Sequence, residues 1–239
     1  MRIATVAIGL GLCCLGEAAL AYRPFDGTDA AVAELGEFEL EAGAGYRREG
    51  PLRNAVAPAA VFNLGIAPDW EAVLQGEVDM QLTPQRAGLV GTGVFLKNVL
   101  RQGVLQDQSG PSIATEFGAL LPGVGSDPGA GASWAGIVSY RWGWLTAHLN
   151  TEIALARDHH ADTFFGVIVE GPRDWPVRPV AEVFREREAG AVETVSGLIG
   201  AIWQAEENLA VDLGLRGASI GRHTVDEVRA GLTIGLPLR

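Results

Sequence analysis

Cysteine is almost absent from this chain. The only two, Cys13 and Cys14, lie within the first twenty residues, so a chain that loses those residues has neither a disulfide nor thiolate chemistry. A cluster of Lys and Arg is also missing, and the formal net charge is −11. Because nucleic-acid binding needs grouped basic side chains that contact phosphates, this composition excludes a nucleic-acid partner.

Two structural signatures of common enzyme classes are also missing. No amphipathic helical pattern interrupts residues 36–239, so an all-β fold is expected. The chain has 32 glycines, but they lie in expected strands and hairpins with no helix after them, which excludes a phosphate-binding loop. We therefore expect neither an enzyme nor a cofactor.

The first residues have the three parts of a secretory signal peptide. Arg2 gives a positive start, Ile3 to Leu12 an apolar run, and Ala19-Leu20-Ala21 a cleavage site of small residues. The alternative, a membrane anchor, is disfavoured because a helix needs roughly 20 apolar residues to cross a bilayer. We predict that residues 1–21 are cleaved after export. Residues 22–35 show no clear period and are expected to form an extended lead-in, either inside a lumen or in solution.

The stretch from Gly36 to Arg47 predicts a strand with one apolar and one acidic face. Successive side chains of a strand point to opposite faces. One alternating set is apolar, comprising Phe38, Leu40, Ala42, Ala44 and Tyr46. The other is charged or small, comprising Glu37, Glu39, Glu41, Gly43, Gly45 and Arg47.

The same alternation recurs along the chain and predicts about twelve strands. Their expected ranges are 36–47, 57–66, 70–80, 89–100, 111–121, a segment ending at 140, then 145–155, 163–170, 177–187, 193–203, 209–216 and 226–236. The strand at 193–203 is apolar on both faces, so its facing is left open. Strands of about ten residues are long enough to cross a membrane when tilted, and an even count places both chain ends on one side.

The connections between these strands are expected to alternate in length. Short ones fall at 67–69, 141–143, 171–176 and 204–207, and looser ones at 48–56, 81–88, 122–130, 158–162, 188–192 and 217–225. Short periplasmic turns and longer outer loops are typical of bacterial outer-membrane barrels, although the long 101–110 connection does not fit. In lipid an open sheet edge leaves amides unpaired, so the sheet must close. We predict a single closed antiparallel up-and-down transmembrane barrel over residues 36–239, in the bacterial outer membrane and in contact with its lipid.

Tryptophans support a membrane interface at one end of this barrel. An aromatic girdle at the periplasmic strand ends is predicted to contain Trp70, Trp142, Trp144, Trp175 and Trp203. The alternative is that these rings cap a soluble barrel.

Several segments resemble the meta-pathway phenol-degradation family of exported outer-membrane barrels. These segments are Arg23-Pro24-Phe25, Thr28-Asp29, Glu34 to Glu41, Ala67 to Glu71, Glu116 to Gly123 and Arg178 to Phe184. The chain departs from the family pattern at Gln85 to Gly88, where a Gly-Asp pair is usual. The resemblance implies a barrel and passage of hydrophobic or aromatic compounds, and it brings no catalytic motif.

The polar faces of the strands give the candidate lumen-lining residues. They are Glu37, Glu39, Glu41, Glu71, Glu77, Lys97, Glu116, His148, Asn150, Glu152, Glu182, Asp212, Arg216 and Arg229. A net acidic lumen attracts cations, whereas the same charges could instead pair into a plug. The leading hypothesis is a channel for small molecules. The alternatives are a blocked structural or surface-interaction barrel and a soluble periplasmic binding barrel.

Two histidine-containing motifs have residue types that occur in catalytic or metal sites. His148 and Asn150 suggest a barrel phospholipase, but no serine nucleophile flanks His148, and the polar face is the wrong side for a lipid substrate. His159-His160 with Asp158 and Asp162 lies in an expected loop, which lacks the fixed geometry of a metal site. Neither a catalytic nor a metal site is predicted.

Overall fold

The structure, a computed structural model, describes residues 23–125, 128–189 and 193–238. It contains twelve strands and one short 3₁₀ helix, η1 (Val104–Gln106). The strands are β1 Glu37–Glu49, β2 Leu52–Ala67, β3 Trp70–Leu82, β4 Gln85–Arg101, β5 Ser112–Leu120, β6 Gly131–Trp142, β7 Leu145–Leu155, β8 Ala161–Glu170, β9 Val177–Glu188, β10 Glu193–Glu206, β11 Leu209–Ile220 and β12 His223–Pro237.

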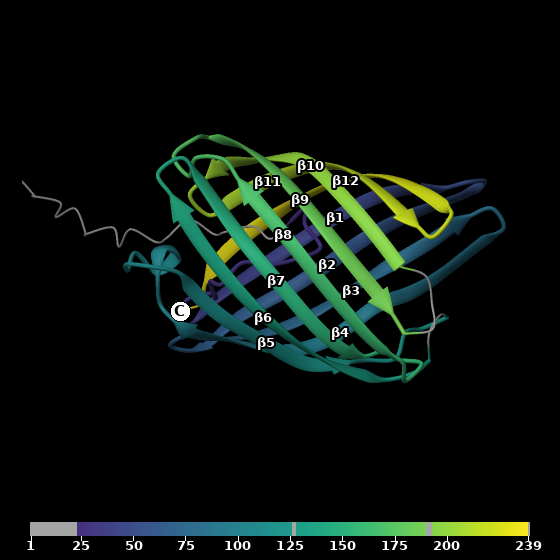
Figure 1. The fold of residues 1–239 in the computed structure, drawn as a ribbon, viewed down its shortest axis with the longest axis horizontal. Helices are drawn as coiled ribbons and strands as arrows, with labels where there is room; N and C mark the ends of the chain where they lie inside the picture. The colour runs from purple at the N-terminus through teal and green to yellow at the C-terminus, as the bar shows by residue number, and fades with distance from the viewer. Residues whose placement is uncertain (1–22, 126–127, 190–192, 239) are drawn as a thin grey trace, which may run out of the picture.

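Every strand pairs antiparallel with its sequence neighbours, and β1 pairs with β12 to close the ring (Figure 1). The closing register runs from Glu37 opposite Pro237 to Glu49 opposite Val225. The predicted closed barrel of twelve antiparallel strands is therefore confirmed. None of the described residues forms a helix long and apolar enough to cross a membrane.

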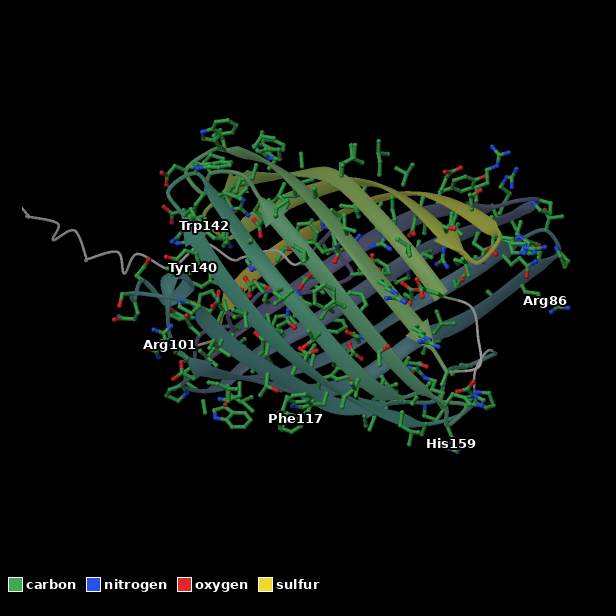
Figure 2. The ribbon with its side chains drawn as sticks, viewed as in Figure 1. Arg86, Arg101, Phe117, Tyr140, Trp142 and His159 are labelled. Atoms are coloured by element: carbon green, nitrogen blue, oxygen red, sulfur yellow. The ribbon has the colours of Figure 1, made fainter. Side chains whose placement is uncertain are left out.

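Alternation along each strand sets which side chains face the lumen. In β1, Glu39 and Glu41 are buried while Tyr46 is exposed. In β7, His148 and Asn150 are buried and Leu149 is exposed. The outer surface is lined by Leu, Ile, Val, Phe and Trp, and most charged groups within the strands face inward. Figure 2 shows this arrangement, with Phe117 on the outside of the wall.

Strand β10 resolves the facing that the sequence left open. Ser196, Leu198 and Ile202 are buried inside the barrel, whereas Ile199 and Trp203 are exposed. The inward Ile202 packs with Val180, Ala210 and Phe25. The apolar inner face of β10 therefore packs against apolar side chains inside the barrel, which explains why the strand is apolar on both faces.

Three predicted outer loops are wrong. At 48–56, 81–88 and 217–225 the strands continue, and each pair is joined by a turn of only two residues. Gly50 and Pro51 do form the first of these turns, but β2 begins at Leu52, before the expected start at 57. Pro58, within the predicted strand, falls in the bulge between Val56 and Ala59, where no ladder N–H is required. The predicted difference in length between the two ends of the barrel is correspondingly absent. We call the end that holds Gly36 and the C-terminus the near end, and the opposite end the far end.

Residues 23–36, the lumen segment, run inside the barrel. Asp29 and Ala30 are buried, and Ala30 packs with Leu105, Ala114 and Ile137. At the near end the Gly36 N–H donates to the Gly65 carbonyl oxygen, and the Leu238 N–H donates to the Gly36 carbonyl oxygen. A Cβ on Gly65 would lie 1.8 Å from the Glu34 carbonyl oxygen, so this close approach requires glycine. The lead-in was expected either inside a lumen or in solution, and its described part lies inside the lumen.

Candidate functional site in the lumen

Inward side chains of β7 and β9 hold the backbone of the lumen segment. The Glu182 carboxylate accepts the N–H groups of Asp26 at 2.9 Å and Gly27 at 2.7 Å. The Asn150 side chain accepts the Thr28 N–H at 3.0 Å and donates to the Thr28 carbonyl oxygen at 2.8 Å. An irregular segment surrounded by protein must have its backbone groups satisfied, and these two side chains meet much of that requirement.

A second polar group, in β6, β7 and β8, supports the segment closer to the near end. The Ser139 hydroxyl oxygen lies 2.8 Å from His148 Nδ1, and His148 Nε2 lies 3.1 Å from the Glu170 carboxylate. A serine therefore does lie beside His148, on the neighbouring strand, and the expectation that none is close is wrong. Sequence reading missed it because cross-strand register brings Ser139 opposite His148.

This Ser–His–Glu arrangement has the contacts of a structural network. Ser139 is fully buried, and its hydroxyl oxygen accepts the N–H of Ala30 at 2.9 Å. Glu170 also lies 3.4 Å from Arg178. A nucleophile needs room for a substrate beside it, and here the lumen segment occupies that room.

The connection predicted at 101–110 spans residues 102–111 in the structure and closes the near end. Its Leu105 is buried against Ala30, and the Gln106 side chain donates to the Ala30 carbonyl oxygen at 3.0 Å. Arg141 donates to the Val104 carbonyl oxygen at 3.1 Å. The cavity among Leu105, Arg141 and neighbouring residues measures only about 10 Å³. The connection that did not fit the expected turn lengths therefore folds over the barrel mouth.

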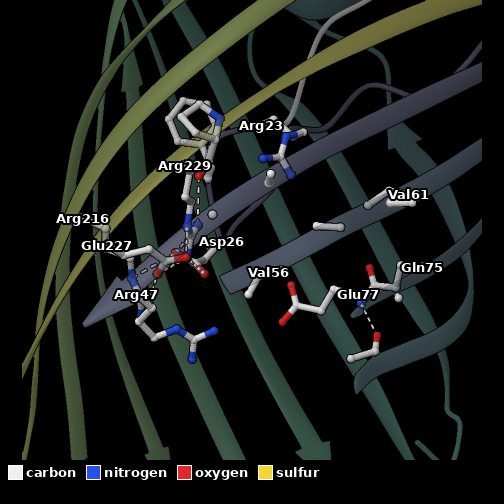
Figure 3. Close-up of a pocket in the computed structure, with 18 residues that line it drawn as sticks. Arg23, Asp26, Arg47, Val56, Val61, Gln75, Glu77, Arg216, Glu227 and Arg229 are labelled. Atoms are coloured by element: carbon white, nitrogen blue, oxygen red, sulfur yellow. Dashed lines mark hydrogen bonds and ion pairs between the residues drawn. The ribbon is translucent and has the colours of Figure 1, made fainter. Parts of the chain in front are cut away.

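An ion-paired cluster joins the lumen segment to β11 and β12. Arg229 contacts Asp26 and Glu227, each at 3.0 Å, and donates to the Pro24 carbonyl oxygen at 2.9 Å. Arg216 also contacts Glu227 at 3.0 Å and Asp26 at 3.6 Å. We call Asp26, Arg216, Glu227 and Arg229 the paired cluster. It lines a cavity of about 410 Å³ whose opposite wall carries Glu77, with Arg47 also facing the space (Figure 3).

A second cavity, the carboxylate cavity, has the opposite character. It measures about 260 Å³ and is lined by four glutamates, Glu41, Glu71, Glu116 and Glu152, and by Asp26 of the paired cluster. Within the part of the chain that the structure describes, none of the four glutamates forms an ion pair with an Arg or His side chain. Lys97 lines the same cavity, between Glu71 and Glu116 in the register, but its amine lies 3.2 Å from the Thr28 hydroxyl and 3.8 Å from Asp29.

A third space, the outer cavity, opens toward the far end. It measures about 610 Å³ and is lined by Arg157, Asp158, Phe164, Phe184 and further residues of the far-end wall. It shares Asp26, Leu120, Glu152 and Phe164 with the carboxylate cavity. The rings of Phe164 and Phe184 are 5.0 Å apart, and the Arg216 guanidinium lies 5.1 Å from the Phe184 ring centre.

The structure brings most of the predicted lumen residues together around the lumen segment. Glu39, Glu41, Glu71, Lys97, His148, Asn150, Glu182 and Asp212 are buried, while Glu77, Glu116, Glu152, Arg216 and Arg229 line cavities. Glu37 is separate from them, because its carboxylate accepts the Glu34 N–H near the barrel mouth. Four participants were missed: Arg23, which lies 3.4 Å from Asp212, and Asp26, Asn63 and Ser139. A segment without periodicity gave no signal for Arg23 or Asp26.

The predicted girdle tryptophans lie at the near end. Trp142, Trp144, Trp175 and Trp203 are about half exposed or more. Trp70 is less exposed and packs edge-on against Phe117 at 6.5 Å. Figure 2 shows Trp142 beside Tyr140 at this end.

The far-end loop histidines stand apart from the lumen network. His160 Nδ1 lies 2.9 Å from Asp158, and both side chains are largely exposed. The hydrogen bond that His160 donates to Asp158 raises the pKa of His160, and the same bond lowers the pKa of Asp158. Among the residues that the structure describes, no group of three or more His, Cys, Asp or Glu is placed to hold a metal ion.

Comparisons with known proteins give the fold. No protein-family model matches the sequence, and no curated protein sequence matches it. The NanC porin superposes with a TM-score of 0.61 at 7% identity, covering 82% of this chain and 98% of the porin. An outer membrane channel from Pseudomonas putida F1 has a TM-score of 0.61 at 10% identity, covering 88% and 98%. The KdgM porin has a TM-score of 0.54 at 11% identity, covering 81% and 98%. At these identities the likeness shows the closed β-barrel fold.

Proposed function

We propose that this chain is an outer-membrane channel that passes small molecules through a lumen narrowed by residues 23–36. The observation that carries the proposal is the division of the closed barrel into an apolar outer wall and a charged interior with cavities. The outer wall exposes Leu, Ile, Val, Phe and Trp side chains such as Leu74, Ile153 and Leu213, which suits acyl chains. The inner wall carries charged groups, several of which line cavities.

The similar structures support this proposal through their fold. Proteins of the same architecture are described as porins and as an outer membrane channel. In this proposal the near-end tryptophans form an interfacial girdle in contact with lipid. The resemblance to the meta-pathway phenol-degradation family points to hydrophobic or aromatic solutes. Residues 1–21, which lie outside the described residues, would be the export signal, and N-terminal sequencing of the exported protein checks their removal.

Planar-bilayer recording of the refolded chain tests the channel. We expect small, stable conductance steps and a reversal potential that favours cations in a salt gradient, because the carboxylate cavity has excess negative charge. Absence of both current and solute flux from well-folded protein would contradict the channel. Recovery of the native protein in a detergent-free soluble fraction would instead support a periplasmic binding barrel.

A blocked barrel is the second candidate, and one observation favours it. The lumen segment contacts strands on several sides of the barrel, and the near end retains a cavity of only about 10 Å³. In this case the barrel serves a structural or surface-interaction role and carries no current. The same bilayer recordings separate the two candidates.

A further inference from the structure

The carboxylate cavity is lined by five carboxylates but by only two basic side chains, Arg23 and Lys97. Glu71 is 2% exposed, and its Oε1 atom has no hydrogen-bond partner, although Oε2 accepts the Ala33 N–H at 2.6 Å. Glu41 has an amide donor, Asn63, at 3.2 Å. A buried carboxylate is costly unless it gains a cation or takes up a proton. An excess of carboxylates around one space therefore favours a bound cation as the partner.

The basic residues on the cavity wall are already engaged elsewhere. Lys97 points to Thr28 and Asp29, and Arg23 lies 3.4 Å from Asp212 while donating to the Ala230 carbonyl oxygen at 3.3 Å. Each of these two basic groups therefore also faces a carboxylate outside the cavity wall. The cavity wall itself keeps more acidic than basic side chains.

The same wall also offers apolar and aromatic surface. Phe25, Phe95 and Phe164 line the cavity together with Val61 and Val73. The face of an aromatic ring attracts a cation, and its body buries apolar groups. A volume of about 260 Å³ lies just below the roughly 300 Å³ at which drug-sized sites begin, so the cavity suits one small molecule. Leu120, Glu152 and Phe164 also line the outer cavity, which gives a route from the far end.

We propose that the carboxylate cavity binds a small organic cation, an ammonium group joined to an aromatic or short apolar body. The ammonium group lies against Glu116 and Glu152, and the apolar body lies against the phenylalanines. The binding site is independent of the proposed channel function. The further statement that the channel transports this cation rests on that function.

Isothermal titration calorimetry of the signal-free chain, folded in an uncharged detergent, tests the site. The probes are phenethylammonium, the neutral phenethyl alcohol and the anionic 3-phenylpropionate, which share an aromatic ring and a short linker. We expect the cation to bind at least tenfold more tightly than the alcohol and the anion to show no binding. Equal affinity for the cation and the alcohol would overturn the site without any variant.

Variants locate the charge that is recognised. Glu116→Gln and Glu152→Gln should each weaken cation binding at least threefold, and the exposed Glu206→Gln should leave it unchanged. Unchanged binding in the folded Glu116→Gln/Glu152→Gln double variant would overturn the site. Flux of the three probes into proteoliposomes is measured separately. Cation binding without flux would support the binding site and contradict the channel function. Equal flux of the cation and the alcohol would support the channel function and show that the site does not select the solute.

Discussion

Two sets of carboxylates share one lumen and differ in their partners. Asp26 and Glu227 each face two arginines in the paired cluster, whereas Glu41, Glu71, Glu116 and Glu152 face none within ion-pair distance. The paired set lies where the lumen segment must be held against β11 and β12. The unpaired set lines the carboxylate cavity. Charge in this lumen therefore holds the segment in one region, and in the other it lines the site that we propose for a cation.

Energetics explain why the two sets respond differently to mutation. Removing one member of a buried ion pair leaves its partner uncompensated and costs about 3–5 kcal/mol. An unpaired carboxylate already bears its desolvation cost in the folded state, so neutralising it should leave stability unchanged or raise it. Proteins keep such locally unfavourable groups mainly at functional sites. Mutations in the two sets should therefore separate stability from selectivity.

The largest effect is expected for Arg229→Ala, which breaks the paired cluster. Its guanidinium contacts Asp26, Glu227 and the Pro24 carbonyl oxygen, so the substitution leaves two carboxylates without one of their arginines. Because Arg216 still faces both carboxylates, we expect the free energy of unfolding to fall by about 3 kcal/mol, the lower end of the cost of breaking a buried ion pair. Urea unfolding in detergent, followed by tryptophan fluorescence, measures this loss.

Arg185→Ala is the matched control for that prediction. Arg185 also forms an ion pair, with Glu193, but both side chains are well exposed to solvent. Exposed pairs contribute roughly 0–1 kcal/mol, so the control should change stability by no more than that. Equal losses in the two variants would show that the paired cluster has no special role.

A smaller loss is expected for Glu182→Gln, which weakens attachment of the lumen segment without breaking an ion pair. In the wild-type chain the two carboxylate oxygens of Glu182 accept the backbone N–H groups of Asp26 and Gly27. The glutamine side chain has only one acceptor oxygen, so one of these two N–H groups loses its acceptor and faces an NH₂ group. An unsatisfied buried donor costs about 1–3 kcal/mol. Hydrogen exchange should accelerate at both amides, and Glu206→Gln should leave exchange there unchanged. Unaltered protection at both amides would mean that Glu182 does not hold the segment.

These contrasts also show what the sequence could reveal. Period-two alternation predicted the facing of Glu39, Leu149 and Asp212, because a one-residue slip would reverse a whole strand. It could not predict the lumen segment, since Arg23 and Asp26 are placed by contacts from distant strands. Ser139 beside His148 depends on register, which alternation alone does not set. The second strand was expected to begin at 57, although β2 begins at Leu52, because the bulge between Val56 and Ala59 interrupts the alternation.

Mutations in the unpaired carboxylates are expected to change ion selectivity. Glu116→Gln should leave stability nearly unchanged and lower the cation-to-anion permeability ratio. One unit charge acting through a hydrated lumen contributes about 1 kcal/mol, which is about a fivefold change in the ratio. Reversal potentials across a tenfold KCl gradient measure it, with the exposed Glu207→Gln as control. A ratio that stays constant would show that the carboxylate cavity is not on the ion path.

The smallest effect is expected at an ion pair outside both sets, Asp158 with His160 in the far-end loop. The Asp158 hydrogen bond raises the pKa of His160, so the stabilisation from His160 is full below its ordinary value of about 6.5 and is lost as pH rises through the raised value. The pKa of Asp158 is lowered, so its own contribution is full above about 3.9 and is lost at more acidic pH. Asp158→Asn should return the His160 pKa toward 6.5, as followed by NMR of the imidazole. Asp162→Asn, which removes a weaker influence, should lower it less. Equal shifts in the two variants would assign the raised pKa of His160 to the general charge of the loop. A larger shift for Asp158→Asn would assign it to the Asp158–His160 pair. Ion pairing would then hold the segment inside the lumen but only a local loop contact where the pair is exposed to water.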